Sequence, residues 1–301
     1  MARRSRRARR DRSSREAPTL PREEVPIDTG TARVEVDPED PQRLTLHVNG
    51  VPSSCLDLAD PGFLAFEYLQ QMAAVVDALP AGPVRAVHLG AAGCALPRYV
   101  EHTRPGSRQI GVDIDAELLR LVRDWFDLPR SPALRLRADD AGRALSGLTP
   151  GLADVVVRDV FDGDTTPEHL VGRAFADACV RALRPGGLLL ANCADRPPLT
   201  TARREVASVA DALGDDPIGQ GRLALVAEPA ILKGRRYGNV TIVAVTSPEQ
   251  DAAPDAAPDA PGSLDVRAAD LGRALRSLAV PAHVLAGAEL SRFVAGAAPL
   301  P

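Results

Sequence analysis

The sequence predicts an α/β protein whose core is a doubly wound, mostly parallel sheet of seven strands, preceded by a small N-terminal β-region. Three observations support this prediction. Short apolar segments alternate with helical segments from Val84 to Val245. Residues 31–51 instead alternate polar and apolar side chains, which is typical of an antiparallel hairpin. Glycine or aspartate follows most of the apolar segments, as in parallel sheets that bind a ligand where their strands end.

Composition excludes several classes of protein. The 301 residues suffice for one large domain with appendages or for two smaller ones. The net charge of −4 argues against a nucleic-acid-binding protein, and no apolar run reaches the ~20 residues of a membrane span. The four cysteines lie far apart without a CxxC pair, so we expect no disulfide, no metal site and a cytoplasmic location.

Residues 1–30 are predicted to be a disordered tail that carries arginine at positions 3, 4, 6, 7, 9, 10, 12 and 15. Two interpretations remain open: an arm that binds nucleic acid or an anionic surface nonspecifically, and a solvated tail without a role. The solvated tail is the simpler interpretation, because almost nothing in the segment can be buried.

Residues 31–60 are expected to form the N-terminal β-region. RVEV and RLTLHV flank the turn-rich PEDPQ in a hairpin, and SSCLDL adds a third strand. A helix with a broad apolar face from Phe63 to Leu79 then opens at Asp60-Pro61. This helix leads through a turn rich in proline and glycine into the first central strand.

The central strands begin at Val84–Leu89, a short apolar segment that suits a strand buried on both faces. Small residues form the turn Gly90–Cys94, and a helix follows with Pro97 in its first turn. The second strand, Gln109–Val112, ends in Asp113. An acidic residue ~20 positions after a turn of small residues can accept both hydroxyls of a ribose. The separation of 23 residues between the turn and Asp113 therefore fits a nucleoside site.

The remaining elements continue the alternation. Further strands are predicted at Leu134–Ala138, Ala153–Val157, Leu188–Cys193, Arg222–Ala227 and Asn239–Val245. Further helices are predicted at Ala116–Trp125, Gly142–Leu148, Pro167–Leu183 and Leu199–Leu213. Residues 61–247 would thus form one nucleoside-binding domain. Residues 248–263 are a Pro/Ala/Asp linker, and residues 264–301 are a helical segment that packs on the core.

Acidic residues follow three of the predicted strands, at the edge where an open parallel sheet binds its ligands. They are Asp113, then Asp139 with Asp140, and finally Asp159 with Asp162 three residues further on. We expect Asp139 to cap the next helix and the other carboxylates to line one crevice. Arg158, beside Asp159, would neutralise part of the negative charge.

The order HLGAAG, GVDID, ADDA, ADVVVRDVFDG and LRPGGLLLAN resembles the class I AdoMet-dependent methyltransferase fold. The preceding segment NGVPSSCLDLADPGFLAFEYLQQM is similar to the N-terminal region of spermidine synthases, which share that fold. The resemblance covers about residues 31–247 and is strongest to divergent spermidine synthase-like proteins of actinobacteria. It implies an aminopropyltransferase with decarboxylated AdoMet or AdoMet as co-substrate and a small-molecule amine as acceptor, and it suggests a homodimer.

By this resemblance the co-substrate would contact nine residues at the strand ends: Gly90, Ala91, Ala92, Gly93, Asp113, Ile114, Asp139, Asp140 and Ala141. The loop would border the aminoacid or aminopropyl end, Asp113 would hold the ribose, and Asp140 would hold the adenine amino group. Asp159 would position and deprotonate the attacking amine, with Glu67 and Asp162 as further substrate-binding residues.

Departures from the family pattern bear on the activity. Gly93 stands where the GGGDG loop of the synthases carries an acid that binds the cofactor amine, and Ser53 stands where they have a glutamine. Ala65-Phe66-Glu67 replaces their Tyr-His-Glu and keeps the acid alone, while DVFDG keeps both acids of DSxDP. A protein with these changes would bind a different amine, use intact AdoMet, or have lost catalysis.

Aminopropyl transfer is the leading hypothesis, with AdoMet-dependent methylation of a small molecule as the close alternative. A nucleoside-binding protein without catalysis would also fit the missing groups. An NAD-dependent oxidoreductase is disfavoured, because Lys233 is the one lysine of the chain and is not part of a Tyr-x-x-x-Lys pair.

Overall fold

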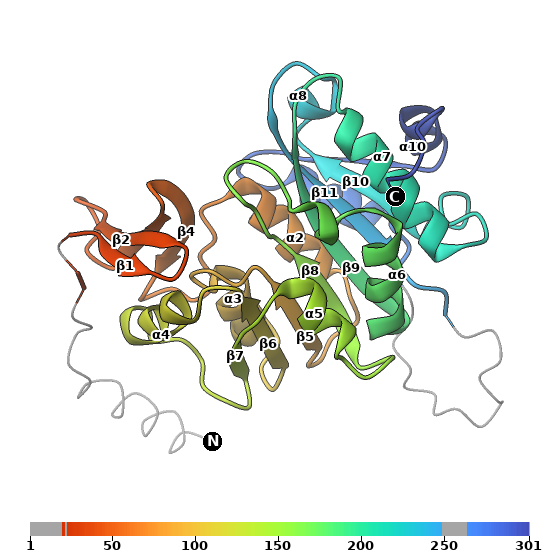
Figure 1. Ribbon diagram of the computed structural model, residues 1–301. Helices are drawn as coiled ribbons and strands as arrows, with labels where there is room; N and C mark the ends of the chain where they lie inside the picture. The colour runs from red at the N-terminus through yellow and green to blue at the C-terminus, as the bar shows by residue number, and fades with distance from the viewer. Residues whose placement is uncertain (1–19, 22, 249–263, 301) are drawn as a thin grey trace, which may run out of the picture.

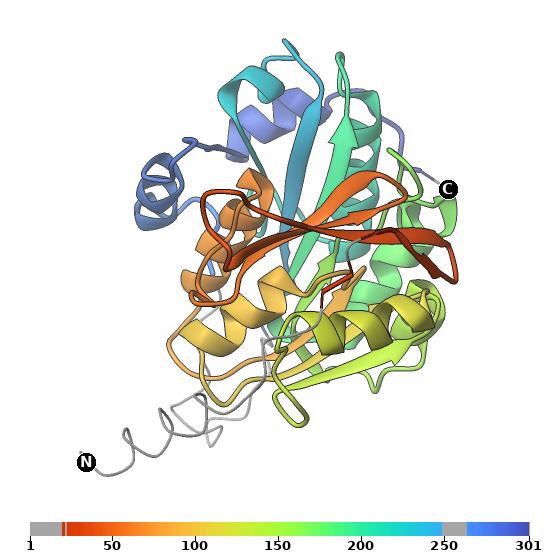
Figure 2. The same ribbon diagram turned by 90° about the vertical axis from the view of Figure 1, so that its left-hand side faces the viewer.

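Two β-sheets organise the chain, one small and one large (Figure 1). The computed structural model describes Leu20, Pro21, residues 23–248 and residues 264–300. The expectations for most of the tail, residues 1–19 and Arg22, and for residues 249–263 of the linker fall outside these ranges. Figure 2 shows the small sheet crossing in front of the large one.

The small sheet is antiparallel and consists of β1 (Val25–Ile27), β2 (Gly30–Val36), β3 (Arg43–Val48) and β4 (Val51–Asp57), in that order. The predicted hairpin and its third strand are therefore confirmed. Strand β1 corrects the predicted tail boundary at residue 30. It pairs with β2, and Ile27 is buried in the core, so the chain is already part of the fold at Val25.

The large sheet has eight strands: β5 (Arg85–Leu89), β6 (Arg108–Asp113), β7 (Leu134–Ala138), β8 (Ala153–Arg158), β9 (Leu183–Asp195), β10 (Leu223–Ala227), β11 (Gly238–Val245) and β12 (His283–Ala286). Their order is β12-β10-β11-β9-β8-β5-β6-β7. The five strands from β9 to β7 are parallel, and β11, β10 and β12 each run antiparallel to the preceding neighbour. The doubly wound, mostly parallel sheet is confirmed.

Strand β12 corrects the predicted count of seven strands. Its four residues pair with β10 at the edge of the sheet, where we expected only a helical segment packing on the core. The sequence HVLA is too short to show a two-residue alternation, so its pattern alone does not separate a strand from a helix.

Helices cover both faces of the large sheet. One face packs against α2 (Glu67–Asp77), α3 (Ala95–Thr103), α4 (Ala116–Trp125) and α9 (Ala269–Arg276). The other face packs against α5 (Ala141–Ser146), α6 (Gly172–Ala182), α7 (Thr200–Leu213), α8 (Pro229–Leu232) and α10 (Gly287–Val294). The small sheet joins the apolar core on the α2 side. Each face of the large sheet is thereby shielded from water, as parallel strands require.

Two predicted helices differ from the observed ones. Helix α2 begins at Glu67 and not at Asp60, because the carboxylates of Asp57 and Asp60 accept bonds from nearby backbone N–H groups and hold the preceding residues in turns. The predicted helix Pro167–Leu183 is divided into the 3₁₀ turn η1 (Glu168–Leu170) and α6. The division falls at Val171, which is extended, and the φ of 80° at Gly172, the first residue of α6, is not helical either.

The small sheet is tied to the N-terminus of α4 through the turn between β1 and β2. Asp115 caps α4 by accepting a bond from the N–H of Leu118, and it also accepts bonds from the backbone and hydroxyl of Thr29. Asp28 accepts bonds from the N–H groups of Ala116 and Glu117. These contacts hold the small sheet beside the carboxyl end of β6, which is where the candidate site lies.

Candidate active site

A cavity of about 670 Å³ opens at the carboxyl ends of β5, β6 and β8. Its other wall comes from the small sheet, through Thr29 and residues of β3 and β4. The sheet order places β5 between β6 and β8, so the cavity lies where successive connections leave the sheet in opposite directions. Ligands of open α/β sheets bind at this topological switch point.

Gly90 opens the loop after β5 and must be glycine for two reasons. Its φ is 82°, and a Cβ atom at this position would stand 2.1 Å from the backbone oxygen of Asp159. The loop is thus pressed against the end of β8, and the N–H of Asp159 donates to the carbonyl of Leu89 at 2.8 Å. Gly90, Ala91 and Ala92 line the cavity.

Gly93 lies behind the loop and is not among the residues that line the cavity. Its N–H donates to Ser54 Oγ at 3.1 Å, and a Cβ atom would come within 2.6 Å of the Ser54 Cβ. The small sheet therefore occupies the space that a longer side chain at position 93 would need. Gly93, which we expected to border the co-substrate, therefore lies outside the lining of the cavity.

Asp113 ends β6 and lines the cavity together with Ile114. Its two oxygens accept bonds from the N–H groups of Ala92 at 3.0 Å and Asp115 at 3.1 Å. Burial raises the pKa of Asp113 above that of an ordinary aspartate, although these N–H groups oppose the shift. Each carboxylate oxygen can accept a second bond, so the group still has capacity for ribose hydroxyls. Ile114 is 66% exposed and offers an apolar surface beside it.

Asp140, and not Asp139 as we predicted, caps the helix that follows β7. Asp140 caps α5 by accepting a bond from the N–H of Arg143 at 2.8 Å, while both oxygens of Asp139 pair with Arg137 and Arg143. Asp140 also contacts His169 Nε2 at 2.8 Å. Burial alone would raise the pKa of Asp140, but the bonds from Arg143 and His169 hold it below the usual value. Both aspartates and Ala141 line the cavity.

Asp159 follows β8 and faces the cavity between two hydrogen-bond donors. Tyr68 Oη donates to one oxygen at 2.8 Å, and Asn192 Nδ2 donates to the other at 2.9 Å. Burial raises the pKa of Asp159, and the bonds from Asn192 and Tyr68 only partly offset that effect. A carboxylate with a raised pKa and a fixed orientation is suited to accept a proton.

Arg158 does not share this environment. The side chain is fully buried on the opposite face of the sheet, where it pairs with Glu205 and donates to the carbonyl of Leu170 at 3.0 Å. Arg158 therefore does not line the crevice, because successive residues of a strand point to opposite faces, although its charge still acts to lower the pKa of Asp159.

Of the two predicted substrate-binding residues, Asp162 lines the cavity and Glu67 does not. Glu67 begins α2 with an exposed side chain and is not among the cavity-lining residues. Asp162 lines the mouth of the cavity, is exposed, and forms an isolated β-bridge with Thr165 through the backbone. Asp162 is thus accessible to a ligand inside the cavity, whereas Glu67 faces solvent outside it.

The polar residues of the cavity that escaped the sequence analysis include Tyr68, His88 and Asn192. Tyr68 follows Glu67 directly, so the comparison of the Ala65-Phe66-Glu67 segment stopped one residue short of it. His88 and Asn192 lie inside apolar strands, where a single polar residue among buried neighbours is the signal that could have identified them.

The charge of the cavity is negative. Six carboxylates line it: Asp113, Asp139, Asp140, Asp159, Asp162 and Asp164. Asp139 is paired with arginines, and Asp164 lies 3.3 Å from Arg196. Within the described residues, Asp113 and Asp159 accept hydrogen bonds from neutral groups and form no ion pair. Two partly buried carboxylates without an ion-pair partner favour a cationic ligand between them.

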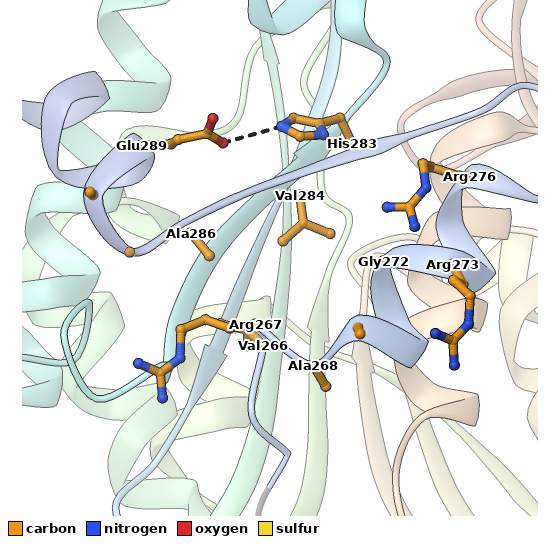
Figure 3. A pocket seen from close by; sticks show the side chains of 13 residues that line it. Val266, Arg267, Ala268, Gly272, Arg273, Arg276, His283, Val284, Ala286 and Glu289 are labelled. Carbon is orange, nitrogen blue, oxygen red and sulfur yellow. Dashed lines mark hydrogen bonds and ion pairs between the residues drawn. The ribbon is translucent and has the colours of Figure 1, made fainter.

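A second hollow of about 540 Å³ lies at the edge of the large sheet that β12 forms, between α9, β12 and α10 (Figure 3). Its charged side chains mostly pair with each other or with close neighbours, as in the contact of 3.3 Å between His283 and Glu289. The cavity above β5 is larger and contains the predicted acids, so we place the candidate active site there.

No cluster of three or more His, Cys, Asp or Glu side chains that could hold a metal ion is found among residues 20–21, 23–248 and 264–300. Over the same ranges, none of the helices has the length and apolar character needed to cross a membrane.

The strand order and the acids at the strand ends define a class I AdoMet-dependent methyltransferase fold. Among solved structures, a probable spermidine synthase from Corynebacterium glutamicum is similar over 93% of this chain and 96% of its own, with a TM-score of 0.80 and 32% identity. A spermidine synthase solved in complex with the transition state analogue AdoDATO covers 77% of this chain and 73% of its own, with a TM-score of 0.52 and 12% identity, and supports the fold alone.

Among curated proteins, a polyamine aminopropyltransferase from Chromobacterium violaceum is 26% identical over 139 residues, which are 46% of this chain and 53% of that protein. Another, from Thioalkalivibrio sulfidiphilus, is 30% identical over 129 residues, which are 42% of this chain and 46% of that protein. The chain thus spans about half the length of these relatives. No model of a known protein family matches it. The protein belongs to the spermidine synthase-like family.

Proposed function

We propose that the protein transfers the aminopropyl group of decarboxylated AdoMet to an amine. The single observation that carries this proposal is that two carboxylates without an ion-pair partner, Asp113 and Asp159, face one cavity from the two strands that flank β5. With a strand spacing of about 4.8 Å, the ends of β6 and β8 lie roughly 10 Å apart. This separation suits a nucleoside whose ribose is held at one end and whose sulfonium lies near the other.

The residues of the cavity fit such a co-substrate. Asp113 would accept bonds from the ribose hydroxyls, with Ile114 against the adenine ring and Asp140 near its amino group. The cavity-lining loop residues, Gly90, Ala91 and Ala92, would leave room for the aliphatic part of the molecule. Six carboxylates around the cavity favour the decarboxylated form, which is a cation without a carboxylate of its own.

Asp159 would act as the general base. The acceptor amine attacks the carbon next to the sulfonium, the new N–C bond forms as the C–S bond breaks, and the bonding electrons pass to sulfur. Methylthioadenosine leaves, and the proton of the amine passes to Asp159. Because a sulfonium is already a good leaving group, the protein would contribute mainly alignment and proton acceptance.

Tyr68 supports retained catalysis over nucleoside binding alone. Its hydroxyl holds Asp159 at 2.8 Å, although the family's Tyr-His-Glu segment is not matched by Ala65-Phe66-Glu67. A protein that only bound a nucleoside would have no need of two donors that orient a carboxylate beyond the ribose. Asp162, at the mouth of the same cavity, would attract the incoming amine.

A product assay tests the proposal. The protein is incubated with a mixture of mono-, di- and polyamines and either decarboxylated AdoMet or AdoMet, and products are identified by mass spectrometry. We expect release of methylthioadenosine and one aminopropylated amine from decarboxylated AdoMet, each dependent on Asp159. Methylated products and S-adenosylhomocysteine from AdoMet, with no reaction of the decarboxylated form, would contradict the proposal.

A further inference from the structure

The tail of decarboxylated AdoMet ends in an ammonium group, and the loop after β5 has no acid to receive it. The loop's own N–H groups are already engaged: those of Gly90 and Ala91 donate to the carbonyl of Val112, and those of Ala92 and Gly93 to Asp113 and Ser54. An ammonium has three donors and requires acceptors. Another residue of the cavity must therefore supply one.

His88 lines the cavity below the two carboxylates, Asp113 and Asp159. In the sheet register it is opposite Gly111 of β6 and Val157 of β8, so it lies on the central strand two residues before the level of Asp113 and Asp159. Residues two apart on a strand share a face, and two residues rise by about 6.6 Å. His88 therefore lies deeper in the cavity than the two carboxylates and on the same face of the sheet.

The tautomer of His88 follows from its neighbours. Gln109 Nε2 donates to the carbonyl of Pro97 at 2.9 Å, which leaves Gln109 Oε1 to accept from His88 Nε2 at 2.9 Å. With the proton on Nε2, Nδ1 carries a lone pair, and it has no hydrogen-bonding partner within the described residues. The side chain is 3% exposed and lines the cavity.

The ring also stays neutral. Burial lowers the pKa of His88 to about 4, and the bond to Gln109 opposes the shift only in part. Near pH 7 an ordinary histidine is partly protonated, whereas Nδ1 of a neutral imidazole with a fixed tautomer remains a hydrogen-bond acceptor.

We infer that His88 binds the terminal ammonium group of the aminopropyl tail through Nδ1 and takes the place of the missing loop acid as the residue that recognises this tail. This inference rests on the proposed function, because it requires that the cavity bind decarboxylated AdoMet. It assigns the polar pair His88–Gln109, buried below the first turn of α3, to co-substrate recognition.

Calorimetric titration with two ligands tests the inference. Decarboxylated AdoMet carries the aminopropyl tail, and methylthioadenosine lacks it. We expect His88→Leu to weaken binding of decarboxylated AdoMet about tenfold or more, as for a lost hydrogen bond to a charged group, and to leave methylthioadenosine affinity within about threefold. His88→Asn, whose amide oxygen can replace Nδ1, should recover part of the loss. His102→Leu, at an exposed position of α3, is the matched control.

Equal weakening of both ligands in His88→Leu, or no change in either, would overturn the inference. If His88→Leu does not fold, ¹⁵N resonances of the wild-type histidines replace it. The Nδ1 signal of His88 should move on addition of decarboxylated AdoMet and not of methylthioadenosine, and an unmoved signal would also overturn the inference. Failure of the proposed function is distinguishable, since the wild-type protein would then bind neither ligand.

Discussion

At the scale of single residues, the candidate chemistry depends on two carboxylates with different partners. Asp113 is held by backbone N–H groups, so its position follows from the shape of the loop. Asp159 is held by the side chains of Tyr68 and Asn192, which come from distant parts of the chain. Both have raised pKa values because of burial, which binding of a cation would reverse.

Asp159→Asn should lower turnover by about 10²–10⁴-fold and leave co-substrate affinity nearly unchanged, because the amide keeps the size of the side chain but cannot accept the proton. Steady-state kinetics and calorimetric titration of the same preparation separate the two effects. Full activity in this variant, together with a large loss in Asp162→Asn, would transfer the role of base to Asp162.

Tyr68→Phe should shift the acid limb of the pH profile of kcat/KM to higher pH. The hydroxyl stabilises the charged form of Asp159, so its removal raises the pKa of that carboxyl further, and the base is lost at a higher pH. The profile is measured for wild type, Tyr68→Phe and Tyr99→Phe. Tyr99 bonds to Asp77 outside the cavity, so its variant should keep the wild-type limb. A shift to lower pH in Tyr68→Phe would be inconsistent with Asp159 as the base.

Asp113→Ala should weaken binding of methylthioadenosine more than tenfold, since a bond to a charged carboxylate contributes roughly 1.5–3 kcal/mol. Asp113→Asn keeps one oxygen that can accept a bond from the N–H of Ala92 in the loop. Comparison of the two variants therefore separates recognition of the ligand from support of the loop. Wild-type affinity in a folded Asp113→Ala protein would show that the carboxylate only holds Ala92 and Asp115 in place.

At the scale of secondary-structure elements, the N-terminus of α4 couples the two sheets. Asp115 is 1% exposed and accepts bonds from its own helix and from Thr29, which lines the cavity. A displacement of the β1–β2 turn would therefore alter the cavity wall. Because Asp113 also bonds to the N–H of Asp115, the same short segment carries both the tether and the proposed ribose site.

Asp115→Ala should cost about 1–3 kcal/mol of unfolding free energy near pH 7, from the lost helix cap and the lost bonds to Thr29. Burial alone would raise the pKa of Asp115, but the bonds from Leu118 and Thr29 hold it below the usual value. A depressed pKa in the folded state stabilises the protein above the unfolded value of about 4 and loses this effect in acid.

The difference between wild type and Asp115→Ala in urea denaturation should therefore shrink as the pH falls below about 4. Asp124→Ala, at an exposed position of the same helix, is the control and should change stability by less than about 0.5 kcal/mol. A pH-independent difference for Asp115→Ala would mean that its carboxylate charge does not contribute to the tether.

Elements with strong local signals were predictable from the sequence. The bounds of α4 and β7 are those expected from their apolar spacing, and β5 and β6 differ by a residue or two. Strand β12 could not be predicted, because its pairing with β10 depends on contacts made after the chain returns from residue 264 onward. The start of α2 depends on turns held by Asp57 and Asp60, for which apolar periodicity gives no signal.

The candidate site was predictable where it follows the strand ends and not where it depends on the small sheet. Asp113, Asp140 and Asp159 all line one cavity, as their positions after parallel strands indicate. The contact of Ser54 with Gly93 and that of Tyr68 with Asp159 each join residues far apart in sequence. Such contacts leave no pattern in a single sequence, so the packing of Gly93 against Ser54 and the hydrogen bond from Tyr68 to Asp159 required the structure.

At the scale of the whole molecule, the cavity is composite. The large sheet supplies the carboxylates and the small sheet closes the opposite wall. This arrangement would surround a small cationic nucleoside with acids on one side and with Thr29, Ser53 and Ser54 on the other. The central claim is that this cavity recognises decarboxylated AdoMet.

Parallel calorimetric titration of the wild-type protein with decarboxylated AdoMet, AdoMet, methylthioadenosine and NAD tests that claim most directly. The account predicts the tightest binding for decarboxylated AdoMet, weaker binding for methylthioadenosine and AdoMet, and none for NAD. Tighter binding of AdoMet than of its decarboxylated form would contradict the proposed co-substrate. Absence of binding for all four compounds would contradict the nucleoside site itself.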